Sequence, residues 1–125
     1  MYPPAFTIAA QSPAVTAVLG SDPVRFYPFG KVPQNEARPY AVWQVVYGTP
    51  DNSLSCVPTE DNYGVQIDAY AKTATDAREV AAALRDAFEE SFNHVVSWNG
   101  EFWEASTGLY RVSFTAEFWT TRTGS

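Results

Sequence analysis

The chain has 125 residues and a single cysteine, so its length fits one domain, residues 1–125, and no disulfide can form within it. Its fourteen acidic and eight basic side chains give a net charge of −6 without a basic cluster, which argues against sequence-independent binding to nucleic acid. No apolar run approaches the roughly 20 residues of a membrane-spanning helix, and no signal peptide is recognisable, so we expect neither a membrane protein nor export. Aromatic residues make up 15% of the chain, more than one small core must hide, which indicates an interaction surface.

The first half of the sequence favours short extended pieces and turns, because all nine prolines lie within its first 58 residues. Ser12 followed by Pro13 predicts the start of a short helix, and Gly20 predicts its end. The extended piece 24–27 stops at Pro28, which favours the edge of a sheet over its centre.

Two long strands are predicted at the centre of the sheet, joined as a hairpin. Residues 40–47 are β-branched or aromatic with Gln44 as the one polar break, so one face needs helices and the other a second layer or another subunit. Residues 63–72 alternate between apolar and polar side chains, as in a half-buried strand. Between them, residues 48–62 form a long acidic loop, of a length that is usually functional or disordered.

The second half begins with the clearest helix. Thr75 is the expected N-cap, and an apolar stripe continues to Phe92. Residues 110–119 alternate as in a long strand, and the polar tail 120–125 is expected to be flexible.

A short hairpin is predicted between that helix and the last strand. Asn99-Gly100 is the dipeptide that best fits a two-residue type I′ turn, so residues 95–98 and 101–104 are expected to pair with each other. The predicted fold class is α+β: a mainly antiparallel sheet with two helices on one face and an additional β-hairpin.

Residue patterns of catalysis and of metal or nucleotide binding are missing from the sequence. The single histidine, His94, lies between a helix end and a strand, and no nucleophile-elbow glycines surround the nearby Ser91, so we expect His94 to cap the helix or face water. His94 and Cys56 cannot supply the four ligands of a structural zinc site, and the acidic loop lacks the spacing of a calcium loop. The glycines are scattered singly, without a phosphate-binding loop. We therefore predict a protein that is not an enzyme and has no cofactor.

Several blocks of sequence, in a fixed order, are similar to one known family. Each block occurs in many folds, but their order and spacing together cover almost the whole chain. The blocks are 25–28 (RFYP), 32–34 (VPQ), 38–43 (RPYAVW), 65–71 (VQIDAYA) with the alanine-rich helix after it, and 109–114 (LYRVSF) through Trp119. In this order they resemble the small tail-completion, or tail-terminator, proteins of long-tailed bacteriophages.

The resemblance implies an α+β subunit that assembles in the host cytoplasm as a hexameric ring on the head-proximal end of the virion tail. There the ring would stop the addition of tail tube protein and offer its other face to the head-completion or connector protein, while DNA passes through the lumen without specific binding. The residues expected to contact the tube or connector are Asp51, Glu60, Asp61 and Tyr63. The residues expected between ring subunits are Trp43, Tyr47 and Trp119, for which an ordinary place in the core is the alternative.

Other functions remain open at the level of sequence. A head-completion protein or another minor tail protein of similar size would fit the same resemblance. A small-molecule-binding or enzymatic α+β domain could instead use the aromatic side chains to line a pocket, and a generic bacterial interaction module is a third alternative.

Overall fold

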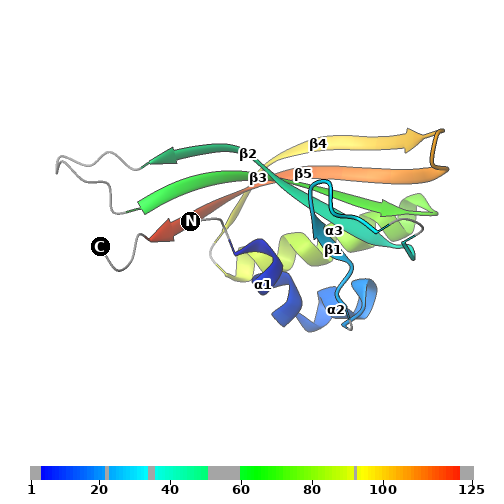
Figure 1. The fold of residues 1–125 in the computed structure, drawn as a ribbon, viewed down its shortest axis with the longest axis horizontal. Coiled ribbons are helices and arrows are strands. Elements are labelled where there is room, and N and C mark those ends of the chain that lie inside the picture. Colours follow the sequence, from blue (N-terminus) through cyan, green and yellow to red (C-terminus); the bar gives the residue numbers. More distant parts are fainter. Residues whose placement is uncertain (1–3, 22, 34–35, 51–59, 92, 122–125) are drawn as a thin grey trace.

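The structure is a computed structural model that describes residues 4–21, 23–33, 36–50, 60–91 and 93–121, with the backbone alone at 49–50, 60–61 and 119–121. The described elements follow one another as two short helices, two strands, a third strand, a long helix and two final strands (Figure 1). They are α1 (Ala5–Gln11), α2 (Pro13–Leu19), β1 (Phe26–Pro28), β2 (Tyr40–Pro50), β3 (Glu60–Ala71), α3 (Ala74–Glu90), β4 (His94–Glu104) and β5 (Leu109–Thr121).

All five strands form one sheet, in the order β1-β2-β3-β5-β4. The short β1 runs parallel to β2, and the other neighbouring pairs are antiparallel. The helices lie on one face of this sheet (Figure 1). The predicted α+β class, with a mainly antiparallel sheet and helices on one side, is confirmed.

The N-terminal region holds one helix more than predicted. Ser12 caps α2 by accepting a hydrogen bond from the Val15 N–H at 3.3 Å, and Gly20 ends this helix, as expected. The preceding α1 was not predicted, because its seven residues have neither a side-chain cap nor an acidic first turn. Ala5 and Ala9 of α1 are nevertheless fully buried, so packing against the core stabilises a helix that has few local signals.

The core lies between the helices and the sheet, and Phe88 of α3 is at its centre. The Phe88 ring lies 6.3 Å from Phe26, 6.5 Å from Phe114 and 5.1 Å from Phe118, measured between ring centroids. Alternate residues of β3 and β5 point to the same side, since Ile67 pairs with Phe114 in register. This face of the sheet, called the helix face below, is closed by α1, α2 and α3.

The N-cap of α3 is Thr73 and not Thr75. The Thr73 hydroxyl accepts the Asp76 N–H at 3.1 Å, and the Thr73 backbone is extended. Strand β3 ends at Ala71 and α3 begins at Ala74, so only Lys72 and Thr73 separate them. Thr73 therefore directly precedes the first helical residue, which is the N-cap position. Phe92, the expected end of the apolar stripe, lies outside the described residues.

The short hairpin predicted at Asn99-Gly100 is wrong. β4 continues through both residues and pairs with β5 along its length, and the register shifts between Trp98 and Gly100. Gly100 has a positive φ of 127°, which serves a β-bulge here and not a turn. Pairing with β5 satisfies more backbone groups than a four-residue hairpin would, and the Asn99 side chain adds bonds to β5. The reversal of the chain comes later, at residues 105–108, where Gly108 has a φ of 69°.

The strands also extend further than predicted. β2 reaches Pro50 and β3 begins at Glu60, so the loop expected at 48–62 is reduced to 51–59, which lies outside the described residues together with Cys56. β5 reaches Thr121, because the backbone of 120–121 pairs with that of 60–61. Of the expected flexible tail, 122–125 lies outside the described residues.

Candidate interaction surfaces

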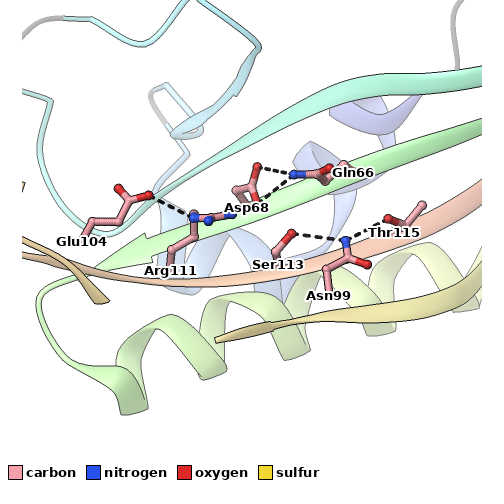
Figure 2. Close-up of polar contacts among 7 residues, drawn as sticks. All are labelled: Gln66, Asp68, Asn99, Glu104, Arg111, Ser113 and Thr115. Carbon is pink, nitrogen blue, oxygen red and sulfur yellow. Dashed lines mark hydrogen bonds and ion pairs between the residues drawn. The ribbon is translucent and has the colours of Figure 1, made fainter. Parts of the chain in front are cut away.

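The face of the sheet opposite the helices, called the polar face below, carries a ladder of charged and polar side chains. Arg111 of β5 lies at its centre: Nη1 donates to Asp68 Oδ1 and Nε donates to Glu104 Oε2, both at 3.1 Å (Figure 2). Gln66 Nε2 donates to the two Asp68 oxygens at 3.1 and 3.3 Å. The guanidinium carbon also lies 4.3 Å from the centroid of the Phe102 ring. The Arg111 side chain on β5 therefore contacts one carboxylate on β3 and a carboxylate and an aromatic ring on β4.

A second polar cluster continues across β4 and β5. Asn99 Nδ2 donates to Ser113 Oγ at 3.3 Å and to Thr115 Oγ1 at 3.0 Å (Figure 2), and Asn99 Oδ1 accepts from Ser97 Oγ at 3.0 Å. Ser113 is 1% exposed. Because its buried polar groups have hydrogen-bond partners, this face is stable without a second apolar layer.

Strand β2 was expected to require a second layer or another subunit over this face. Neighbouring side chains of the same sheet already cover much of the β2 side chains here. Tyr40 stacks on Tyr70 of β3 with 5.1 Å between ring centroids, and Val42 and Gln44 are half-buried. Burial, with the Asp68 carboxylate as the next cause, raises the pKa of Tyr70 to about 12. Burial also raises the pKa of Tyr40. Both phenols therefore stay protonated near neutral pH.

The outer edge of β4, called the β4 edge below, is rich in exposed apolar side chains. β4 is the last strand of the sheet, so its outer backbone groups face no described strand. Trp103 packs on Tyr110 with 4.8 Å between ring centroids, and next to them a cleft of about 230 Å³ is bordered by the exposed ion pair of Arg78 and Glu101. The exposed apolar residues are Val96, Trp98, Phe102, Trp103 and, on β5, Tyr110.

The opposite edge of the sheet, called the β1–β2 edge below, presents a hollow of about 420 Å³ lined by Pro28, Phe29, Trp43, Gln44 and Val45. Phe29 lies in a tight turn that is closed by the hydrogen bond from Lys31 N–H to Pro28 O at 3.0 Å. Its own N–H donates to Trp43 O at 2.8 Å, so the turn is held against β2. The Phe29 side chain is 69% exposed. This edge therefore offers an apolar recess with a protruding aromatic ring beside it.

The residues predicted to contact the tube or connector lie at one end of the sheet where they are described. Asp51 lies outside the described residues, and the backbone of Glu60 and Asp61 belongs to the start of β3, where side chains are not described. Tyr63 follows on the helix face, half-buried against the core. These contacts remain predictions.

The residues predicted between subunits are distributed over both faces. Trp43 is half-buried on the helix face, where it packs against the core and lines the hollow. Tyr47 lies on the polar face, 42% exposed, and its hydroxyl donates to Glu117 Oε2 at 3.2 Å. The Trp119 backbone pairs with Asn62, and its side chain is not described.

Sequence reasoning missed the β4 edge and the ladder around Arg111. The β4 edge was missed because the predicted hairpin paired residues 95–98 with 101–104. That pairing leaves no long outer strand at this side of the sheet. The sequence does indicate polar residues on one face of each strand, Gln66 and Asp68 on one and Arg111 and Ser113 on the other. Which of them become neighbours depends on the register of the two strands, which is set by the sheet.

No group of three or more His, Cys, Asp and Glu side chains in the described part of the chain could hold a metal ion. No described helix is long and apolar enough to cross a membrane. His94 is exposed at the start of β4, in agreement with the expectation that it faces water.

Comparison with known proteins gives a family match over most of the chain. The family model described as tail completion protein gp17 matches residues 6–121. The chain belongs to this family. Among solved structures, a chain from the virion of a native gene transfer agent particle shares the fold of this tail completion protein, with a TM-score of 0.60 at 11% sequence identity, over 94% of this chain and 92% of that chain. No curated protein matches.

Proposed function

We propose that this tail completion protein forms a hexameric ring on the head-proximal end of the phage tail tube, stops tube growth and provides the interface to the head connector. The observation that carries the proposal is the family match over residues 6–121. The similarity to a chain of a gene transfer agent virion supports a place in a phage-like particle. The role is structural and uses no catalysis or cofactor.

Termination of this kind rests on unlike surfaces. A tube grows because each added ring presents a complementary face to the next one, so a ring that matches the tube on one side only ends the polymer. The two ends of this sheet differ in kind: one carries the acidic start of β3, and the other carries the turn 105–108 between β4 and β5. Unlike ends are what such a cap requires.

The acidic end is the proposed contact with the tube or connector. It contains Glu60 and Asp61 at the start of β3, with Tyr63 next on the helix face. The proposal includes Asp51, which lies outside the described residues. Carboxylates at such a surface would select a partner with complementary basic groups. Contacts between subunits are proposed for Trp43, Tyr47 and Trp119.

The polar face is a suitable surface for DNA to pass. The strands carry the acidic residues Asp68, Glu104 and Glu117 on this face, and Arg111 is already engaged by the first two of them. Arg111 is therefore not free to bind phosphate. We propose that this face points to the lumen.

The test is a phage that carries a stop codon in this gene. Loss of a terminator predicts tails of abnormal length that do not join to filled heads, as seen by electron microscopy. The purified protein added to growing tubes should arrest elongation, and mass measurement should give a hexamer on the tube end. Tails of normal length with unjoined heads would instead assign the protein to head completion and refute termination.

A further inference from the structure

We infer that the subunits associate head to tail through their sheet edges, with the β4 edge of one copy seated on the β1–β2 edge of the next. The inference rests on the proposed ring and names the surfaces that build it. The partner on each edge is thus a second copy of this chain.

The direction of the strands permits this contact. Each of the pairs β2–β3, β3–β5 and β5–β4 is antiparallel, so β4 runs opposite to β2. A copy rotated about an axis along the strands therefore places its β2 antiparallel to β4 of the first copy, with both helix faces on the same side. Contacts between unlike surfaces of this kind form a ring when the rotation from copy to copy closes.

Both edges have backbone groups available for pairing. β1 covers β2 only at Ala41, Val42 and Trp43, so from Gln44 onward the outer side of β2 faces no described strand. The outer side of β4 faces none along its length in the described chain. The first half of β4, from His94 to Trp98, has the length to pair with Gln44–Gly48.

Matching irregularities favour this partner over a flat strand. β2 has a register shift between Val45 and Tyr47, and β4 has one between Val95 and Ser97. The extra residues are Val46 and Val96, both about half exposed, at 46% and 49%. A bulge on an edge strand disfavours its pairing with a regular strand. Two edge strands that are bulged at the same level of the sheet are bent at the same place, so they can pair with each other.

The side chains at the two edges are also complementary. Trp43, Ile67, Phe114 and Trp98 form one row across the sheet on the helix face, so continuation of the sheet brings the exposed Trp98 ring to the level of the hollow beside Trp43 of the next copy.

The charges at the edges agree with this direction of pairing. Glu101 and Glu104, which pair with Arg78 and Arg111 of their own subunit, lie at the end of β4 that would meet the start of β2, near which the exposed Arg38 is found. Opposite charges at facing rims steer association and fix the register. The reverse direction of pairing would bring the acidic end of β4 to the acidic start of β3 instead.

The experiment uses one charged substitution on each edge. Val96→Glu alters the β4 edge and Phe29→Glu alters the β1–β2 edge. Phe6→Glu, at a 43% exposed position on helix α1 and not on an edge strand, is the matched control. Circular dichroism and thermal melting check that each variant is folded. Assembly is measured by sedimentation velocity in solution and by electron microscopy on tube ends, and the variants are compared under the condition in which the wild type assembles.

We expect each edge variant to raise the concentration for half-assembly at least tenfold, and the control to assemble like the wild type. An equimolar mixture of the two edge variants should form dimers and nothing larger, because only one intact pair of unlike edges remains. Rings formed by either edge variant at wild-type concentrations, or a mixture that stays monomeric, would overturn the edge contact and leave the proposed function standing. A wild-type protein that stays monomeric even on tube ends would refute the ring itself, and the edge contact with it.

Discussion

The ladder around Arg111 gives a quantitative test of the polar face. Replacing Arg111 by Met keeps a flexible apolar stem over the Phe102 ring but removes the cation from between Asp68 and Glu104. Asp68, which is 7% exposed in the wild type, is then left with only the Gln66 amide as its side-chain donor among the described residues. The variant therefore places a carboxylate in a poorly solvated site without its counter-charge.

The size of the effect follows from the degree of burial. The side chains of Arg111 and Asp68 are 22% and 10% exposed. A fully buried pair loses 3–5 kcal/mol when one partner is removed and a surface pair about 0–1 kcal/mol, so for Arg111→Met we expect a loss of about 2 kcal/mol in the free energy of unfolding. Asp68→Asn should lose about 1 kcal/mol, since Glu104 still compensates Arg111, and the coupling between the two sites should be about 1 kcal/mol.

The assay is urea unfolding followed by tryptophan fluorescence, for the wild type, both single variants and the double variant. The matched control is the same cycle at Arg78 and Glu101, which bond at 2.7 Å but have side chains that are 58% and 51% exposed. That pair should show no resolvable coupling and should respond to salt, whereas the Asp68–Arg111 coupling should persist in salt. Equal coupling at the two sites, or none at Asp68–Arg111, would refute the reasoning from burial.

Three further predictions concern single positions. Because the folded-state pKa of Tyr70 is raised from 10.0 to about 12, its contribution to stability is complete below pH 10 and is lost as pH rises towards 12; Tyr70→Phe should flatten that part of the melting profile. Thr73→Ala should cost about 1 kcal/mol in urea unfolding by removing the helix cap, while Thr75→Ala should change little, and the reverse result would restore the N-cap predicted from sequence. Gly100→Ala should cost about 1–3 kcal/mol because φ is 127° there, and an unchanged melting temperature would contradict the bulge geometry.

The elements that sequence predicted well are those with strong local signals. The Ser12-Pro13 start and the Gly20 end of α2 are set within one turn of the chain, and Pro28 at the sheet edge follows from a missing backbone donor. The strand around residues 40–47 is marked by its β-branched and aromatic residues, and the strand around 63–72 by its alternation. The structure confirms all of these.

The errors arise where two local structures were equally compatible with the residues. Asn99-Gly100 suits a type I′ turn and equally a bulge, and the choice depends on the partner strand β5. Thr73 and Thr75 are both able to cap a helix, and the end of β3 at Ala71 decides between them. α1 has no cap at all and depends on the burial of Ala5 and Ala9.

The candidate surfaces divide in the same way. Composition alone indicates an interaction protein, and the order of the sequence blocks already points to the family that the match over residues 6–121 establishes. The arrangement of Arg111 between Asp68 and Glu104, and the exposure of the β4 edge, depend on contacts between residues far apart in the chain.

By itself, the sequence determined the class of fold, the central strands and the long helix, because periodicity and proline or glycine positions act over a few residues. The order of its sequence blocks carried the resemblance to the family. Only the tertiary structure decided the strand order, the register and the open edges. A one-residue change of register exchanges the two faces of a strand, and the energy that selects the register comes from the packing of the whole sheet against Phe88 and its neighbours.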